Sequence, residues 1–119
     1  MNPAKILEKA KEVFDIEIGA LRSVKDELGD SFVELVNKAL EITENGGKIV
    51  ISGIGKSGHV GKKISATFAS TGSPSVFMHP VEAMHGDLGM VQKGDMLLAL
   101  SFSGESDELL QMIPAIKRF

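Results

Sequence analysis

The residues best suited to chemistry lie in a glycine turn, Gly53-Ile-Gly-Lys-Ser-Gly-His59, which follows an apolar strand and opens a helix. The start of a helix directs backbone N–H groups and the positive end of its dipole at one point, which favours phosphate. At that point Gly55 is followed by the ammonium of Lys56 and the hydroxyl of Ser57. The turn therefore predicts a phosphate site. The alternative is that its glycines serve only a tight turn and close packing of the helix on the strand.

The same turn matches the G-x-G-x-x-G pattern of dinucleotide-binding folds. That pattern needs an acidic residue about 20 positions further on, but no Asp or Glu occurs between Glu44 and Glu82. A P-loop would need a glycine at the position of Val50. Neither nucleotide pattern is complete, so a compact phosphate ester is the favoured ligand.

A second turn with polar residues, Ser101-Phe-Ser-Gly-Glu-Ser106, also joins the end of an apolar strand to the start of a helix. The hydroxyls of Ser101, Ser103 and Ser106 can bond phosphate oxygens, or they can cap the helix. Two such turns at one edge of a parallel sheet indicate a crevice at a topological switch point. Together the two turns favour a phosphorylated small molecule.

Groups that could transfer protons lie in or beside these turns. His59, His79 and His85 are the only histidines, and Glu105 and Glu108 fall in the first turns of the last helix. Histidine exchanges protons near neutral pH, which suits acid–base catalysis beside a phosphate site. The alternatives are packed or capping histidines and carboxylates that complement a helix dipole. The spacing in residues 79–87 fits no strong zinc pattern, so no metal and no cofactor are predicted.

The elements that position these residues alternate between helix and strand. Apolar residues at helical spacing predict a helix over residues 3–28, capped by Asn2, and a second that opens with the capping box Ser31-Phe-Val-Glu34. Strands are expected at 49–52, 75–78 and 96–100, with one helix at 57–71 and another that follows the serine turn to the end of the chain, bent near Pro114. The segment 79–91 should hold one helical turn. We expect a parallel sheet with right-handed crossovers, and a third strand buried on both faces.

Size and composition narrow the class of protein. The chain has 119 residues, a net charge of −3 and no cysteine. The charge argues against broad nucleic-acid binding, and no apolar run approaches the roughly 18 residues of a membrane span. The N-terminus is charged and amphipathic rather than a signal peptide. We expect one domain or part of one, in the cytoplasm, with N-terminal helices at 1–46 and the α/β part at 47–119.

Four segments carry a family resemblance: the first glycine turn, Ser70-Thr-Gly-Ser-Pro74, the long motif from His79 to Met90, and the serine turn. They resemble the sugar isomerase (SIS) domain family and, within it, the arabinose-5-phosphate isomerases. The resemblance covers about residues 30–119. The motif from His79 to Met90 is its most specific part.

The resemblance implies a flavodoxin-like, three-layer α/β/α domain with a five-stranded parallel sheet, here truncated after the third strand–helix unit. It implies interconversion of D-ribulose 5-phosphate and D-arabinose 5-phosphate through an enediol, for Kdo and lipopolysaccharide synthesis, by a homotetramer or dimer. Carried over by motif, the catalytic residues are Lys56, His85 and Glu108. The substrate phosphate is held at Gly55, Ser57, Ser101, Ser103 and Ser106.

Other functions stay open on the sequence. The chain could be an isomerase for another sugar phosphate, or a non-catalytic SIS module that senses a sugar phosphate. Family members carry further strands and active-site residues, and many carry CBS domains. We therefore expect the 119-residue chain alone to be inactive, with its third strand left as an exposed apolar edge.

Overall fold

The computed structural model describes residues 2–104 and 106–118. By contacts, the chain forms two compact units, residues 1–36 and 37–119. The elements in chain order are α1 (Pro3–Glu27), α2 (Asp30–Glu44), β1 (Ile49–Gly53), α3 (Gly55–Ser70), β2 (Ser75–Phe77), α4 (Pro80–Met84), the 3-10 helix η1 (Asp87–Met90), β3 (Met96–Leu100) and α5 (Asp107–Lys117). Among the described helices, none is long and apolar enough to cross a membrane.

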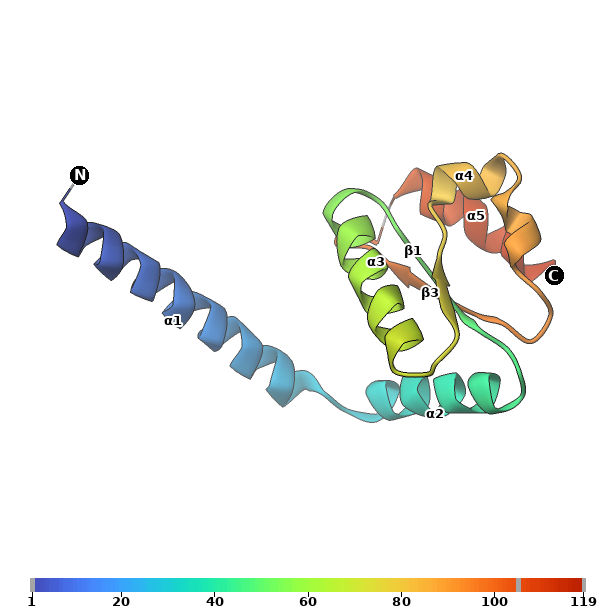
Figure 1. Cartoon of the computed structure of the whole chain (residues 1–119), viewed down its shortest axis with the longest axis horizontal. Helices are drawn as coiled ribbons and strands as arrows, with labels where there is room; N and C mark the ends of the chain where they lie inside the picture. Colours follow the sequence, from blue (N-terminus) through green and yellow to red (C-terminus); the bar gives the residue numbers. More distant parts are fainter. Residues whose placement is uncertain (1, 105, 119) are drawn as a thin grey trace. The chain divides into compact units, whose positions relative to one another are not determined.

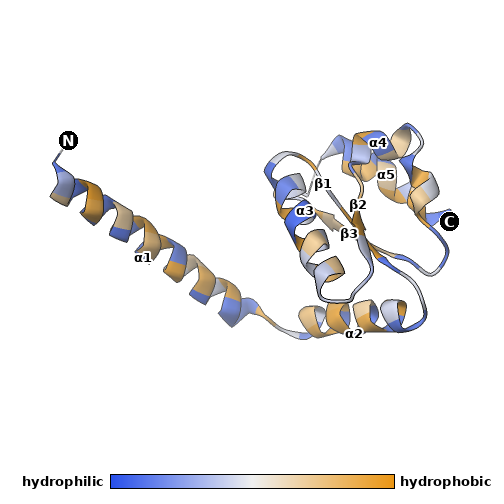
Figure 2. Cartoon of the chain, in the orientation of Figure 1, coloured by the Kyte–Doolittle hydropathy of each residue, from blue (hydrophilic) through white to orange (hydrophobic). Residues whose placement is uncertain are grey.

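Helix α1 begins as predicted, because the side chain of Asn2 accepts a hydrogen bond of 2.9 Å from the Ala4 N–H. Apolar and polar residues alternate along α1 (Figure 2), and none of its residues is buried. Leu7, Phe14 and Leu21 are 62%, 67% and 69% exposed. Their spacing of seven residues places them on one side of the helix. Helix α1 thus presents an apolar face to solvent.

The predicted capping box of α2 is wrong. The helix begins at Asp30, so Ser31 lies inside it. The N–H groups of Phe32 and Val33 donate to the carbonyl of Gly29, at 3.1 and 3.4 Å. Gly29 takes the capping position, which glycine tolerates well, and the S-x-x-E pattern is not used.

The second unit contains a parallel sheet in the order β2-β1-β3. Ile49 of β1 pairs with Ser75 of β2 and with Met96 of β3. All five residues of β1 are buried, because the strand has neighbours on both sides and helices on both faces. Helix α3 covers one face, and α4 and α5 cover the other (Figure 1). The predicted three-layer α/β/α architecture with a parallel sheet is confirmed.

Successive residues of β1 pack against different layers, as the pleat of a strand requires. Val50 belongs to a core cluster on the side of α4 and α5. The members of this cluster are Val50, Met78, Ala83, Val91, Leu109 and Met112. Ile51 lies on the other face, under α3, where its Cγ2 would be 3.1 Å from a Cβ atom placed on Gly61. One buried strand therefore links two layers of side chains.

Strand β3 departs from its predicted burial. It spans the predicted residues, but they are only partly buried, and Ala99 is exposed. In the part of the chain that the structure describes, β3 pairs only with β1, so it is an edge strand, as expected. A run of apolar residues without alternation indicates a strand suited to burial on both faces. Whether the strand is buried depends on the elements that lie beside it.

The other predicted boundaries hold to within a few residues. Strand β1 extends to Gly53, β2 ends at Phe77, and α3 begins at Gly55, two residues early. The segment after β2 holds two helical turns, α4 and η1, where one was predicted. Pro114 lies inside α5.

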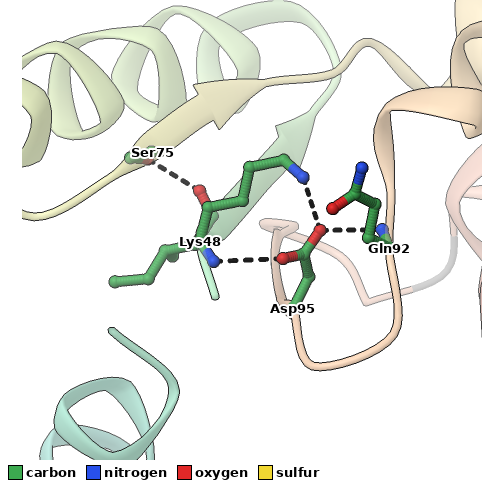
Figure 3. A network of polar contacts seen from close by, with 5 residues as sticks. Lys48, Ser75, Gln92 and Asp95 are labelled. Carbon is green, nitrogen blue, oxygen red and sulfur yellow. Dashed lines mark hydrogen bonds and ion pairs between the residues drawn. The ribbon is translucent and has the colours of Figure 1, made fainter. Parts of the chain in front are cut away.

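A buried carboxylate fastens the start of β1 to the loop before β3 (Figure 3). Asp95 accepts hydrogen bonds from the Lys48 backbone N–H at 3.0 Å, the Lys48 Nζ at 2.6 Å and the Gln92 N–H at 2.8 Å. The Asp95 side chain is only 5% exposed. Burial raises the pKa of this carboxyl, but the Lys48 ammonium and the two amides outweigh it, so the net pKa is lowered.

We predict that Asp95→Asn lowers the free energy of unfolding at pH 7 by roughly 1–3 kcal/mol, because charge-assisted hydrogen bonds are lost. The pKa of Asp95 is lower in the folded state, so its contribution is complete above the ordinary value of 3.8 and is lost as the pH falls through the folded-state value. Urea unfolding at several pH values measures this. The difference between wild type and variant should shrink only in acid.

The matched control is Glu41→Gln, which removes an exposed ion pair with Lys38 in the same unit. Its effect should stay within about 0.5 kcal/mol. Equal losses in the two variants would contradict the role given to Asp95.

Candidate functional site

The turn between β1 and α3 leaves backbone N–H groups available to an anion. Gly55, the first residue of α3, has φ +60°, a conformation that other residues rarely adopt. Ile54 occupies the capping position, and no side chain caps the helix there. The first turn of α3 contains no acidic residue. The N-terminus of α3 therefore keeps its affinity for negative charge.

Small residues hold α3 close to the sheet. A Cβ atom on Gly58 would lie 2.7 Å from the carbonyl oxygen of Gly53, a distance at which the backbone must move. One turn on, a Cβ on Gly61 would lie 3.1 Å from the Ile51 Cγ2. Gly58, Gly61 and Ser65 are the buried residues of α3. Their spacing of three and four residues lets the helix lie against β1 with its first turn at the strand's carboxyl end.

A groove of about 840 Å³ lies where the turns after β1 and β3 meet. Its lining residues are Ile54, Lys56, Ser57, Val60, Ala99, Leu100, Ser101 and Phe102. Strands β1 and β3 are parallel neighbours, so their carboxyl ends share one edge of the sheet. The chain leaves β1 for α3 on one face and leaves β3 for α5 on the other. This is the topological switch point at which α/β sheets bind ligands.

The polar part of this groove suits an anion. Lys56 is exposed, and it forms no ion pair with the residues that the structure describes. Ser57, which follows it, is half-buried. No carboxylate is found among the groove's described lining residues. The remaining lining is mostly apolar, so the charge of Lys56 is not offset by these residues.

The serine turn forms the other wall of the groove. The Oγ of Ser101 accepts a hydrogen bond of 2.8 Å from the Gly104 N–H, which fixes the turn and leaves the hydroxyl hydrogen able to donate. Ser103 is exposed in the same turn. Ser106 occupies the capping position of α5, but its side chain makes no capping hydrogen bond. The helix-capping alternative is therefore wrong for Ser106. Glu105 lies outside the described residues.

The structure does not bring every predicted residue into the groove. His85 is the C-cap residue of α4, and Glu108 lies in the first turn of α5. Both are exposed, and neither lines the groove. Their two helices pack against each other. Thus Lys56, Ser57 and Ser101 are gathered, whereas the two acid–base candidates lie on neighbouring helices outside the groove.

A smaller cavity of about 210 Å³ lies on the other side of α3, and Gly55 belongs to it. Its lining residues are Gly55, Gly58, His59, Lys62, Phe77 and His79. The Lys62 Nζ lies 5.4 Å from the centre of the Phe77 ring. In residues 2–104 and 106–118, no group of three or more His, Asp or Glu side chains could hold a metal ion.

Sequence reasoning missed the apolar lining of the groove and the shared cavity of His59 and His79. The sequence could have indicated Val60, because Val60 lies four residues after Lys56 and so shares a face of α3 with it. Phe102 lies between two predicted serines, but nothing in the sequence indicated its exposure. The two histidines come from different elements, so only the fold could bring them together.

Fold and site together define a class of protein: a parallel α/β/α domain whose switch point carries a groove suited to an anion. Residues 41–119 match the model of the SIS domain, and the chain belongs to this family. The resemblance read from the motifs is confirmed.

Relatives within the family are closely similar. The chain is 50% identical over 113 residues to arabinose 5-phosphate isomerase KdsD of Pseudomonas aeruginosa, covering 94% of this chain and 33% of that protein. It is 46% identical over 112 residues to arabinose 5-phosphate isomerase GutQ of Escherichia coli K12, covering 94% and 34%. A protein of E. coli CFT073, solved in complex with arabinose 5-phosphate, superposes with a TM-score of 0.91 at 41% identity, covering 99% and 61%. The chain thus spans about a third of these curated relatives.

We predict that Gly58→Ala weakens both the fold and the site. The added methyl would meet the Gly53 carbonyl oxygen, so α3 must shift from β1. Overpacking of this kind costs roughly 1–3 kcal/mol. Urea unfolding measures the loss, and titration with inorganic phosphate measures binding at the displaced turn.

Gly89→Ala is the control, because a Cβ there would meet nothing within 4 Å. It should change the free energy of unfolding by no more than about 0.5 kcal/mol. A neutral effect of Gly58→Ala would show that the close approach is not required.

Proposed function

We propose that this chain supplies the phosphate-binding part of an arabinose 5-phosphate isomerase, which interconverts D-ribulose 5-phosphate and D-arabinose 5-phosphate. The groove with Lys56, Ser57 and Ser101 at the ends of two neighbouring strands carries the proposal. Its described lining has a positive charge and hydroxyl donors without a carboxylate, which suits a phosphate ester. The similarity to KdsD and GutQ, and the sugar phosphate bound in a related structure, support the choice of sugar.

The chemistry assigns a role to each residue. Isomerisation through an enediol moves a proton between C1 and C2 and places negative charge on the enediolate oxygen. Lys56, which lines the groove from the start of α3, stabilises that charge. His85 and Glu108 act in proton transfer or ring opening, which needs an acid–base pair. Ser57, Ser101, Ser103 and Ser106, with the Gly55 turn, hold the phosphate.

On the basis of the motif resemblance, we also propose a role for this reaction in the cell. The reaction would supply D-arabinose 5-phosphate for Kdo and lipopolysaccharide, in the cytoplasm. The alternative, a sugar-phosphate sensor, is favoured by one observation: His85 and Glu108 do not line the groove. Turnover separates the two functions, since a sensor needs the phosphate site without the acid–base pair.

We predict that Lys56→Ala lowers kcat by on the order of 100- to 1000-fold, because a charge that acts on the transition state is removed. The enzyme for this test is a chimera in which residues 1–119 replace the matching third of KdsD from P. aeruginosa. His85→Ala and Glu108→Gln should each lower kcat by roughly 100-fold or more. Turnover of D-ribulose 5-phosphate is measured, together with rescue of a strain that lacks arabinose 5-phosphate isomerase.

Lys63→Ala is the matched control, because Lys63 is an exposed lysine of α3 that does not line the groove. It should leave kcat within about twofold of wild type. An active Lys56→Ala chimera would refute the role of Lys56. A chimera that binds the sugar phosphate without converting it would favour the sensor.

We also propose that the protein is a homo-oligomer, a dimer or tetramer, that uses the apolar face of α1. Leu7, Phe14 and Leu21 form this face, and large apolar patches on a protein surface mark interaction sites. A second copy would present the same stripe, as the self-complementary interfaces of symmetric oligomers require.

We predict that Phe14→Ser with Leu21→Ser lowers the molar mass in solution to that of the monomer, because burial of this face drives association. Light scattering after size exclusion measures the mass. Lys5→Ser with Glu12→Ser has the same spacing on the opposite side of α1 and should leave the mass unchanged. A double apolar variant with the wild-type mass would exclude this face.

A further inference from the structure

His79 and His85 stand at the two ends of one very short helix. Helix α4 contains only five residues, Pro80–Met84, with His79 as its N-cap and His85 as its C-cap. Of the two histidines, only His85 takes part in the proposed reaction. The helix between them is too short to be stable by its own hydrogen bonds, so its ends must be fixed by contacts outside it.

The imidazole of His79 caps this helix. The ring Nδ1 accepts a hydrogen bond of 3.2 Å from the Val81 N–H. The backbone carbonyl of His79 accepts one of 2.9 Å from the Ala83 N–H. An Nδ1 that accepts must carry no proton, so the ring is neutral, with its hydrogen on Nε2. The cap satisfies one of the N–H groups that every helix start leaves unpaired.

The chain is fixed on the N-terminal side of His79. Met78 is 1% exposed, its N–H donates to the Ile51 carbonyl at 2.8 Å, and its carbonyl accepts from the Ser52 hydroxyl. Pro80 and Ala83 are buried. The cap therefore ties the first turn of α4 to a rigid point at the end of β2.

On the C-terminal side, the orientation of α4 determines the position of His85, its C-cap residue. The His85 N–H donates to the Glu82 carbonyl at 3.0 Å, and Gly86 follows with φ +128°. The His85 side chain is exposed, so α4 rather than the core sets its place. Because α4 has only five residues, a change that loosens its first turn also displaces its last residue.

We propose that His79 is a positioning residue for His85, and that its neutral ring holds α4 in place while a proton on Nδ1 releases it. The inference rests on the proposed isomerase function, in which His85 transfers protons. Asn, Asp and Ser are the usual N-caps, and Asn and Ser keep their acceptor at every pH. Histidine changes charge between pH 5 and 8. A histidine cap therefore makes the position of His85 depend on pH.

The groups that face His79 are few. His59 and Lys62 of α3 line the cavity beside it, and Phe77 forms an apolar part of the wall. The described charged residues of η1 and α5 do not line this cavity, and Glu82 of α4 is exposed. Among the described residues, no carboxylate lines the cavity beside His79.

The test uses His79→Asn, which caps without titrating, and His79→Ala, which does not cap. In the 119-residue chain, the Val81 amide signal in NMR should move together with the His79 ring signals between pH 5 and 8, and it should stay fixed in His79→Asn. Exchange of the Val81 amide should be between roughly 2- and 30-fold faster in His79→Ala than in wild type or His79→Asn. A Val81 signal that ignores the His79 ring, or equal exchange in both variants, would overturn the cap.

The chimera then tests the consequence for catalysis. His79→Ala should lower kcat by roughly 10- to 100-fold with little change in KM, because a displaced His85 affects proton transfer and not the phosphate groove. His79→Asn should restore kcat and lose its acid-side activity less steeply than wild type. The matched control His59→Asn removes the other imidazole of the cavity and should keep the wild-type pH profile.

The outcomes separate the two proposals. If the wild-type chimera does not convert the sugar phosphate, the proposed function fails, and the NMR titration still decides whether His79 caps α4. If the cap is found but His79→Ala retains full kcat, the positioning role is refuted while the isomerase stands.

Discussion

The contact on which the rest of this domain depends is the approach of α3 to β1 at Gly58. With no side chain at that position, the helix backbone lies against the Gly53 carbonyl, so the first turn of α3 sits directly over the strand's carboxyl end. Lys56 and Ser57 of that turn then line one groove together with Ser101 of the turn after β3. A longer separation between α3 and β1 would leave the carboxyl end of the strand exposed and would widen the groove.

The layered fold was predictable because its signals are local. Apolar runs, glycine turns and the Asn2 cap each act over a few residues, and they located the three strands and the helices α3 and α5 of the second unit to within a few positions. The burial of β3 was not predictable, because it depends on what lies beside the strand. The ion pair of Lys48 with Asp95 was not predictable either, since it joins residues 47 positions apart with no motif to connect them.

For the site, the order of strands and helices predicted which residues meet, which the spacing of residues in the sequence could not. Two polar turns after parallel strands must share an edge, so the meeting of Lys56, Ser57 and Ser101 followed from the order of elements. His85 and Glu108 came from motif resemblance, which carries residue identity but no distance. They lie on α4 and α5, and the packing of those helices decides where the side chains reach. The N-cap formed by His79 was not predicted either. Its hydrogen bond joins residues only two positions apart, but histidine is not among the usual N-cap residues.

The two parts of the proposed site rest on elements of very different length and burial. The groove at the switch point is built on β1, which is wholly buried, and on a 16-residue helix packed against it. His85 follows a helix of five residues fixed by two buried side chains and one imidazole. In the proposed isomerase the phosphate is held by the buried, well-packed part, and a preorganised anion site loses little entropy when it is filled. If the proposed function holds, affinity for the phosphate and the rate of turnover can vary independently, because different elements govern them.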